Sequence, residues 1–281
     1  MIIIADSGST KTHWKLIESG KVVAEFTTQG LNPYYCKPDT YRIALIHSFP
    51  SEYNANEVGK VCFYGAGCSN SEMSDLVRSG LCLFFQNALV KVYTDILAAA
   101  RALFGTGEGI AIILGSGANI GYYNGEELEH KTPSLGFVLG DEGSGAYLGK
   151  GLIKSWLYDE LPKEISFQLQ KEYPFSINQI LNKIYAEPFP NRFLASFIPF
   201  LERNSGHPYI NKMVDNAFEN FVHNHLLKYK NFKNFPIGVV GSVGAIFQSN
   251  LSRIIEKHGG NLVRVVRYPI TELVNYHLEK A

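Results

Sequence analysis

Long apolar runs are missing from this sequence. The opening apolar stretch ends at Asp6, and no basic residue precedes it. A secretory signal peptide has a basic start and a longer apolar segment, so residues 2–6 are better interpreted as a buried strand. No other stretch approaches the roughly 18 consecutive apolar residues of a membrane-spanning helix. We therefore expect a cytoplasmic protein with no membrane partner.

A surplus of either charge is also missing. Lysine and arginine together number 26, and aspartate and glutamate together number 26. Proteins that bind nucleic acid or anionic lipid usually carry a basic excess on one face or along one segment. The balanced charge therefore favours a small-molecule partner and predicts no nucleic-acid partner.

Cysteine is scarce, and its spacing is irregular. The four cysteines are Cys36, Cys62, Cys68 and Cys82, with no C-x-x-C pair and no matching histidine pattern. A disulfide framework or a zinc site would need such spacing. The cysteines are therefore expected to be reduced thiols, most of which pack as small apolar side chains.

The periodic pattern that is present occurs twice. Residues 1–105 predict three strands followed by alternating helices and strands, and after Gly105-Thr106-Gly107 the same order begins again. In the second copy a helical segment, about 144–229, is expanded and interrupted by prolines. This repeat predicts an α/β fold of two lobes, 1–105 and 106–281, each with a mixed sheet flanked by helices and with a cleft between the lobes. The last helix, 271–278, is a candidate to pack back on the first lobe.

Three turns are rich in glycine and hydroxyl side chains. They are Asp6-Ser7-Gly8-Ser9-Thr10-Lys11-Thr12, Gly115-Ser116-Gly117-Ala118-Asn119 and Gly241-Ser242-Val243-Gly244. Glycine allows backbone N–H groups to approach a ligand closely. The first two turns occupy equivalent places in the two copies, so the folded repeat is expected to bring them face to face. Such a pair of turns suits the phosphates of a nucleotide.

Two better-known phosphate motifs do not fit these turns. A P-loop needs glycine directly before its lysine, but Thr10 precedes Lys11. A dinucleotide fingerprint that begins at Gly115 needs its last glycine at position 120, but the glycine stands at 121. The fingerprint also needs a helix to follow, whereas a strand is predicted there. Both a P-loop enzyme and a nicotinamide enzyme are therefore disfavoured.

Five short stretches, in the same order, resemble one superfamily. Asp6-x-Gly8-x-Thr10 resembles the first phosphate motif of the actin-like ATPase and hexokinase superfamily, Gly115-Ser116-Gly117 its second, and residues 237–244 its adenosine motif. Residues 94–100 and 136–144 resemble signature stretches of the N-acetylglucosamine kinase branch, within the BadF/BadG/BcrA/BcrD ATPase grouping. The resemblance spans Asp6 to Gly244. It implies a duplicated ribonuclease H-like fold, with a five-stranded mixed sheet in each lobe.

The resemblance also implies an activity and a set of site residues. The protein is expected to use ATP and Mg²⁺ to phosphorylate N-acetylglucosamine to its 6-phosphate, with Asp95 as the base for the attacking hydroxyl. Asp6 is expected to hold the hydrated Mg²⁺. The expected ATP contacts are Asp6, Gly8, Ser9, Thr10, Lys11, Thr12, Gly115, Gly241, Ser242 and Gly244. The expected sugar contacts are Asn32, Ser116, Gly117, Asn119, Gly136 and Asp141, where amide and carboxylate groups suit sugar hydroxyls.

Several alternatives stay open at this point. The sugar could be N-acetylmuramic acid or glucosamine, and Phe137 stands where better-known kinases of the branch have tryptophan. A non-catalytic sugar sensor would keep the same fold. An ATPase activator of a 2-hydroxyacyl-CoA dehydratase would need cysteines in the second lobe for its iron-sulfur cluster, and none follows Cys82. Whether the Lys11 side chain contacts phosphate, whether Glu142 and Ser144 bind ligand or cap a helix, and whether the chain forms a homodimer are not decided by the sequence.

Overall fold

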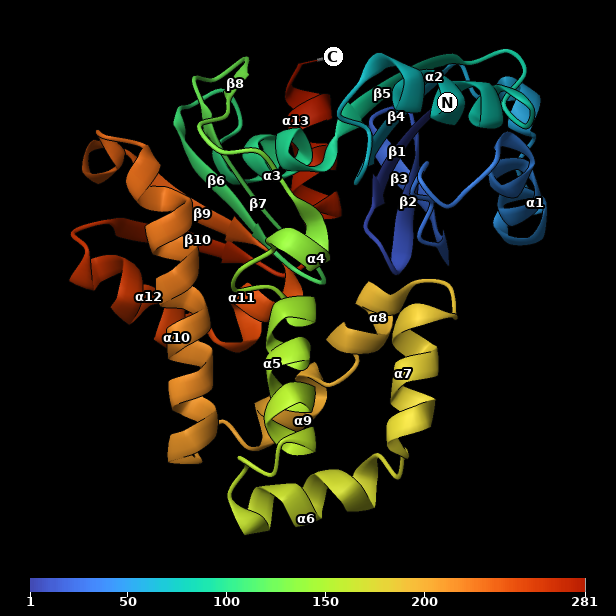
Figure 1. The fold of residues 1–281 in the computed structure, drawn as a ribbon. Coiled ribbons are helices and arrows are strands. Elements are labelled where there is room, and N and C mark those ends of the chain that lie inside the picture. The colour runs from blue at the N-terminus through green and yellow to red at the C-terminus, as the bar shows by residue number, and fades with distance from the viewer. Residues whose placement is uncertain (281) are drawn as a thin grey trace. The chain divides into compact units, whose positions relative to one another are not determined.

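The computed structural model describes residues 1–280, and the chain divides into two compact units. Unit 1 comprises Met1–Gly107, Tyr123–Leu128 and the closing residues from Tyr268 onward. Unit 2 comprises Glu108–Tyr122 and Glu129–Arg267. Figure 1 labels the helices and strands of both units.

Unit 1 is built on a five-stranded sheet in the order β3-β2-β1-β4-β5. Its strands are β1 (Ile2–Ser7), β2 (Lys11–Glu18), β3 (Lys21–Gln29), β4 (Lys60–Gly65) and β5 (Leu89–Thr94). β2 pairs antiparallel with both β1 and β3, whereas β1, β4 and β5 run parallel to one another. The sheet is therefore mixed, as the sequence predicts.

Helices cover both faces of this sheet. They are α1 (Pro38–Ser48), α2 (Ser71–Cys82), α3 (Asp95–Phe104) and α13 (Ile270–Glu279), with a short 3-10 helix at Ala55–Glu57. Because successive strand residues point to opposite faces, Ile3 joins the core under α1 and α2, whereas Ile4 joins the core under α3 and α13. Each face of the sheet is thus buried by its own pair of helices.

Unit 2 repeats this sheet. The strands of this second sheet are β6 (Gly109–Leu114), β7 (Ala118–Tyr123), β8 (Leu128–Glu129), β9 (Pro236–Val240) and β10 (Asn261–Val266), and only the tip of the hairpin, Tyr123–Leu128, is assigned to unit 1. Their order, β8-β7-β6-β9-β10, matches β3-β2-β1-β4-β5 strand for strand, and β9 lies parallel to both β6 and β10. The repeated order confirms the predicted duplicated α/β fold.

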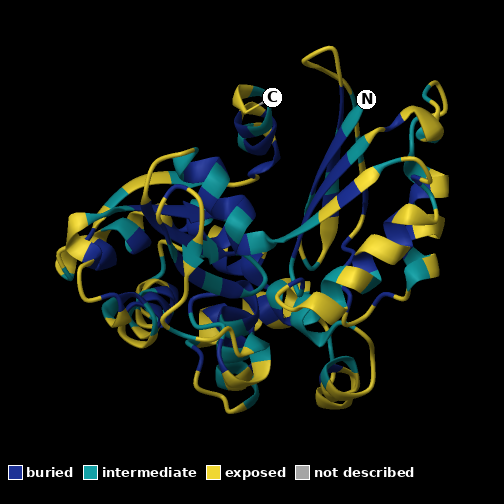
Figure 2. Cartoon of the chain, turned by 90° about the horizontal axis from the view of Figure 1, so that it is seen from above, coloured by how far each residue is buried: buried dark blue, intermediate teal, exposed yellow. Residues whose placement is uncertain are grey.

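The helices of unit 2 enclose a larger core. They are α4 (Gly136–Leu139), α5 (Gly145–Leu157), α6 (Lys163–Glu172), α7 (Ile177–Tyr185), α8 (Pro190–Ala195), α9 (Ile198–Arg203), α10 (Pro208–Asn224), α11 (Ser242–Ile246) and α12 (Gln248–Lys257), with 3-10 helices at Leu226–Lys228 and Phe232–Asn234. Pro190 and Pro208 each begin a helix, where the missing N–H has no intrahelical partner to lose. The central strands β1, β4, β6 and β9 are mostly buried, and Figure 2 shows the exposed residues mainly in the loops and helices.

Two elements of unit 2 are limited by contacts with distant residues. β8 spans only Leu128–Glu129, because the Lys131 N–H bonds to the Tyr229 hydroxyl instead of to a strand. The helical segment after β9 is divided at Phe247, whose buried ring accompanies non-helical backbone angles. The short helix α4 was not expected. Over residues 1–280, no helix is both long enough and apolar enough to cross a membrane.

Candidate active site

Two carboxylates of unit 1 lie at the same edge of its sheet. Ser7 at the end of β1 pairs with Gly65 at the end of β4, and Gly65 in turn pairs with Thr94 at the end of β5. Asp6 directly precedes Ser7, and Asp95 directly follows Thr94. Ligands of α/β sheets bind at the carboxyl ends of parallel strands. This edge is therefore the place in unit 1 where chemistry is expected.

Asp6 has an unusual electrostatic environment. Strand alternation turns its side chain toward the face covered by α3, and Asp95 is the first residue of α3. Burial, together with the negative charge of Asp95, raises the pKa of Asp6 to about 7. Two carboxylates held this close favour a bound cation, because a cation offsets their mutual repulsion.

Asp95 is not needed as the cap of its helix. The Thr94 hydroxyl accepts a hydrogen bond from the Leu97 N–H at 3.3 Å and caps α3. Asp95 accepts a bond from the adjacent Ile96 N–H at 2.8 Å through Oδ1. The N-terminal end of a helix favours an ionised carboxylate. The geometry thus holds a half-buried carboxylate at the start of α3.

The first glycine-rich turn is held in place by hydrogen bonds from backbone and hydroxyl groups. The Gly8 N–H donates to the Lys11 carbonyl at 3.0 Å, and the Gly30 N–H donates to the Thr10 carbonyl at 2.9 Å. A Cβ on Gly30 would lie 2.5 Å from the carbonyl oxygens of both Gly8 and Ser9, so only glycine fits there. Thr10 and Lys11 are exposed, whereas Ser9 is half-buried.

The Thr12 side chain stabilises this turn through hydrogen bonds. Its hydroxyl is buried, lies 2.8 Å from the Ser7 hydroxyl and donates to the Gln29 carbonyl at 3.0 Å. The Ser7 hydroxyl also accepts a bond from the Leu31 N–H at 3.1 Å. These bonds tie the turn to the segment that leads to Asn32.

Asn32 lies beside the loop that follows β4. A Cβ on Gly67 would lie 2.7 Å from the Asn32 side-chain oxygen, and that oxygen accepts a bond from the Tyr34 N–H at 3.0 Å. Cys68 follows Gly67 in this loop and lies close to Asp95. Burial, and then the negative charge of Asp95, raise the pKa of Cys68 to about 12. The loop containing Gly67 and Cys68 thus connects the surroundings of Asn32 with those of Asp95.

In unit 2, the second and third glycine-rich turns come together. The Gly115 N–H donates to the Gly117 carbonyl at 3.0 Å, and the start of α5 donates to the turn through the Gly145 N–H, which lies 2.8 Å from the Gly115 carbonyl. A Cβ on Gly241 would lie 2.3 Å from the Leu114 carbonyl oxygen. Ser242 begins α11 and is half-buried, and Gly244 packs against Val239.

Asp141 extends its carboxylate to the second turn. Its Oδ1 accepts a bond from the Ala118 N–H at 3.2 Å, and a Cβ on Gly117 would lie 3.1 Å from its Oδ2. Burial raises the pKa of Asp141, and the Ala118 N–H opposes that rise. Its backbone has a φ of 57°, in the left-handed region. Gly117 and Asp141 therefore form one compact group.

The other predicted residues of unit 2 lie near this group in sequence but have different surroundings. Asn119 is half-buried, and its side-chain oxygen accepts a bond from the Ile120 N–H at 2.9 Å. Ser116 accepts a bond from the Ala146 N–H at 3.1 Å through its carbonyl. Gly136 begins α4 with a φ of 71°, so its glycine is required by the backbone angle.

The structure also assigns partners to Glu142 and Ser144. Ser144 is buried and caps α5 by accepting a bond from the Tyr147 N–H at 3.2 Å. Glu142 accepts a bond from the Asn224 side-chain amide at 2.8 Å, and His225 Nε2 lies 3.0 Å from its other oxygen. Although burial opposes it, the hydrogen bond with His225 contributes to a lowered pKa of Glu142. Sequence reasoning gave no role to His225, because more than eighty residues separate it from Glu142.

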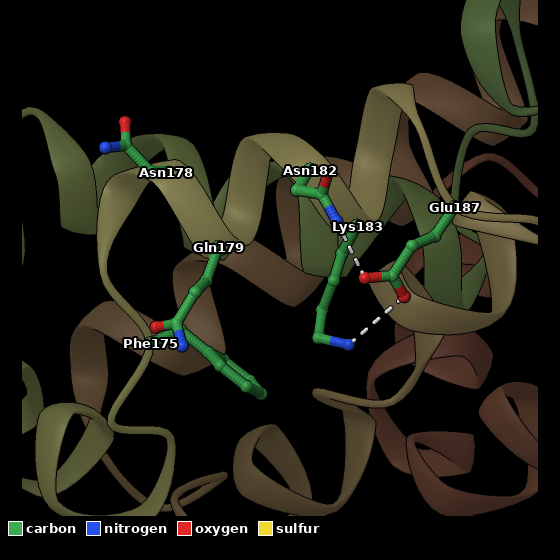
Figure 3. A pocket seen from close by; sticks show the side chains of 6 residues that line it. All are labelled: Phe175, Asn178, Gln179, Asn182, Lys183 and Glu187. Atoms are coloured by element: carbon green, nitrogen blue, oxygen red, sulfur yellow. Dashed lines mark hydrogen bonds and ion pairs between the residues drawn. The ribbon is translucent and has the colours of Figure 1, made fainter.

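One pocket of about 350 Å³ lies elsewhere in unit 2 (Figure 3). It is lined by Phe175, Asn178, Gln179, Asn182, Lys183 and Glu187. Lys183 already pairs with Glu187 at 3.3 Å, and most of the lining belongs to the single helix α7. None of the predicted site residues lines it. We therefore locate the candidate site at the glycine-rich turns and not at this groove.

Comparisons with known proteins agree with the fold. No protein-family model matches the sequence, and no curated protein matches it significantly. A solved structure from Porphyromonas gingivalis, described as a "putative N-acetylglucosamine kinase", is 36% identical, with 99% of each chain covered and a TM-score of 0.92.

Two more distant structures share the fold. A second protein described as a "putative N-acetylglucosamine kinase", from Chromobacterium violaceum, is 16% identical, with 98% of each chain covered and a TM-score of 0.74. The ethanolamine utilization protein EutJ from Carboxydothermus hydrogenoformans is 17% identical, with 98% of this chain and 89% of that chain covered and a TM-score of 0.55. From the 36% identity over almost the whole length of both chains, together with the duplicated sheets, we conclude that this protein has the actin-like ATPase fold and belongs to the N-acetylglucosamine kinase-like family.

Proposed function

We propose that the protein is an ATP-dependent kinase that phosphorylates a hydroxyl of an amino sugar, with N-acetylglucosamine as substrate and its 6-phosphate as product. The observation that carries the proposal is the position of Asp95. Its carboxylate lies at the carboxyl edge of the unit 1 sheet, beside Asp6 and at the start of α3. A carboxylate in this position can act as the base for an alcohol acceptor that binds at the same edge.

In this proposal Asp95 accepts the proton of the sugar hydroxyl that attacks the γ-phosphate of ATP. Phosphoryl transfer depends mostly on positioning and on charge stabilisation, so a single well-placed carboxylate is sufficient as the base. Asn32, beside the Gly67 loop, and Asp141, beside Gly117, offer oxygen and amide groups for the other sugar hydroxyls. Ser116, Asn119 and Gly136 complete the proposed sugar contacts.

The residues present fit a hydrated Mg²⁺ ion. Asp6 supplies a hard oxygen ligand, and because burial and then the negative charge of Asp95 raise its pKa, a divalent cation beside it would favour the ionised carboxylate. When bound, Mg²⁺ would supply charge neutralisation for the phosphates. Asp6 would hold the hydrated ion, while the backbone of the braced turn around Gly8 orients the phosphates.

The remaining nucleotide contacts are proposed for both units. In unit 1 they are Ser9, Thr10, Lys11 and Thr12, with Thr12 acting through the hydrogen bonds that hold the turn. In unit 2 they are Gly115, Gly241, Ser242 and Gly244, where the close approach of Gly241 to Leu114 leaves no room for a side chain.

The direct test is a screen of amino sugars with ATP and Mg²⁺. ADP release is followed by a coupled assay, and the product is identified by mass and by the position of the phosphate. We expect sugar-dependent ADP release that is fastest with N-acetylglucosamine. Binding of an amino sugar without ADP release, for every sugar tried, would contradict a kinase and favour a sensor.

A further inference from the structure

A group of metal-binding side chains lies where α10 meets α12 in unit 2. Glu219 and His223 stand one turn apart on α10, and His258 directly follows the end of α12. One ligand atom from each of the three residues can be chosen so that all three atoms lie within 4.8 Å of one another. None of these residues belongs to the candidate active site.

The group lies at one end of a row of polar side-chain contacts between α10 and α12. Asn211, Asp215, Glu219 and His223 repeat every four residues on α10 and so share one face. Asp215 pairs with Arg253 at 2.6 Å, and Glu219 pairs with Lys257 at 2.5 Å. The other contacts in this row are ordinary hydrogen bonds and ion pairs between carboxylate, amide and basic groups. The end of the row at Glu219 differs, because the imidazole rings of His223 and His258 meet there, with centroids 5.4 Å apart.

Two imidazoles and one carboxylate form a recognised set of zinc ligands. Zinc sites with three protein ligands use this set and keep a fourth position for water. In a tetrahedral site the ligand atoms lie roughly 3.4 Å apart, so a set already within 4.8 Å closes with small side-chain rotations. The His223 side chain is exposed and can rotate at little cost.

The two oxygens of Glu219 have different partners. Oε1 faces Lys257 at 2.5 Å, and Oε2 lies 2.7 Å from His258 Nε2. A metal ion can take the place between Oε2 and the imidazoles while Lys257 keeps Oε1.

We propose that Glu219, His223 and His258 bind one Zn²⁺ ion and thereby fasten α10 to the end of α12. The proposal does not depend on the proposed kinase activity. The positive charge of Lys257 lies beside the site and weakens the binding of a cation, so removal of this charge is predicted to tighten it.

The test uses the full chain, treated with a chelator and then titrated with Zn²⁺ by calorimetry without nucleotide. We expect one equivalent whose affinity falls at least about tenfold in His223→Ala, and similarly in His258→Ala and Glu219→Gln. Co²⁺ titration should give the visible absorption of a tetrahedral site in the wild type and lose it in His223→Ala. Thermal unfolding should shift upward by roughly 5 °C when free Zn²⁺ exceeds the dissociation constant about a hundredfold.

Two further variants give the test its controls. His47 is an exposed histidine in the last turn of α1, so His47→Ala removes a comparable surface histidine away from α10 and should leave Zn²⁺ affinity unchanged. Lys257→Ala should increase the affinity for Zn²⁺. If the polar contacts between α10 and α12 only held the helices together, no such increase would be expected. Because His223 is exposed, its variant is expected to fold, and circular dichroism checks this. The proposal is overturned if the wild type binds no Zn²⁺, or if His223→Ala binds it as tightly as the wild type does.

Discussion

Asp6 and Asp95 lie close enough at the carboxyl edge of the unit 1 sheet that the charge of Asp95 adds to burial in raising the pKa of Asp6. Such a like-charge pair destabilises the fold at neutral pH. Groups whose pKa values are this strongly perturbed, in a partly buried position, are candidates for function. The pair therefore indicates that this edge is shaped for a ligand at some cost in stability.

Asp95→Asn tests the proposed base. The amide keeps the shape and can still accept the Ile96 N–H, but it cannot accept a proton from the sugar. We expect kcat to fall by about 10² to 10⁴-fold while sugar binding, measured by calorimetry, is retained. Asp39→Asn is the matched control, because Asp39 is an exposed carboxylate in the first turn of α1. Substantial kinase activity in Asp95→Asn would contradict the assignment.

Asp6→Asn should separate stability from activity. The folded-state pKa of Asp6, about 7, lies above its unfolded value, so its contribution favours folding at low pH and is lost as the pH rises through 7. At pH 8, without Mg²⁺, the variant should therefore be more stable than the wild type by on the order of 1 kcal/mol in denaturant unfolding. Mg²⁺-dependent ADP release should be lost. Equal stability of the two proteins at pH 8 would contradict this electrostatic interpretation.

Gly30→Ala should displace the first phosphate turn. The new methyl group would lie 2.5 Å from two carbonyl oxygens of the turn, at Gly8 and Ser9, so the backbone must move. We expect a loss of roughly 1–3 kcal/mol in unfolding free energy and a KM for ATP raised about tenfold. Gly206→Ala is the control, because nothing lies within 4 Å of its added Cβ. An unchanged KM for ATP would exclude this turn from nucleotide binding.

Asp141 allows charge and backbone conformation to be separated. Asparagine tolerates the left-handed φ of 57°, and its side-chain oxygen can still accept the Ala118 N–H. Asp141→Asn should therefore keep the melting temperature while the KM for the sugar rises about tenfold. Asp141→Ala should raise the KM similarly and also lose about 1 kcal/mol of stability. If Asp141→Asn binds sugar as the wild type does, Asp141 has no role in recognition.

We expect His277 to make the folding stability of unit 1 decrease at acid pH. Its Nε2 lies 2.9 Å from the Tyr64 hydroxyl, which also accepts a bond from Arg101 at 2.7 Å. Burial, and then the charges of Lys60 and Arg101, lower the pKa of His277 to about 4. The unfolded chain takes up the proton near pH 6.5, so this contribution to stability is present above pH 6.5 and is lost as the pH falls toward 4.

His277→Gln removes the titrating group and keeps an acceptor for the Tyr64 hydroxyl. Between pH 7 and pH 5 the wild type should lose more stability than the variant, by on the order of 1 kcal/mol in denaturant unfolding. Parallel pH profiles for the two proteins would show that His277 is not responsible.

Much of the fold could be predicted because its signals are local. The continuous apolar run of β1 and the Ser19-Gly20 turn between β2 and β3 depend on neighbouring residues alone. The same holds for the capping of α3 by Thr94. The end of β8 and the break at Phe247 could not be predicted, because each depends on a side chain or a core that lies far along the chain.

The sequence by itself determined the repeat of three strands followed by alternating helices and strands, and the glycine-rich turns at its strand ends, because hydrophobic period and turn chemistry act over a few residues. Only the tertiary structure decided the closeness of Asp6 to Asp95 and the pairing of Glu142 with His225. It also decided the meeting of His258 with Glu219. Charge, burial and coordination act through space, and the partners that set them are brought together only when distant segments pack.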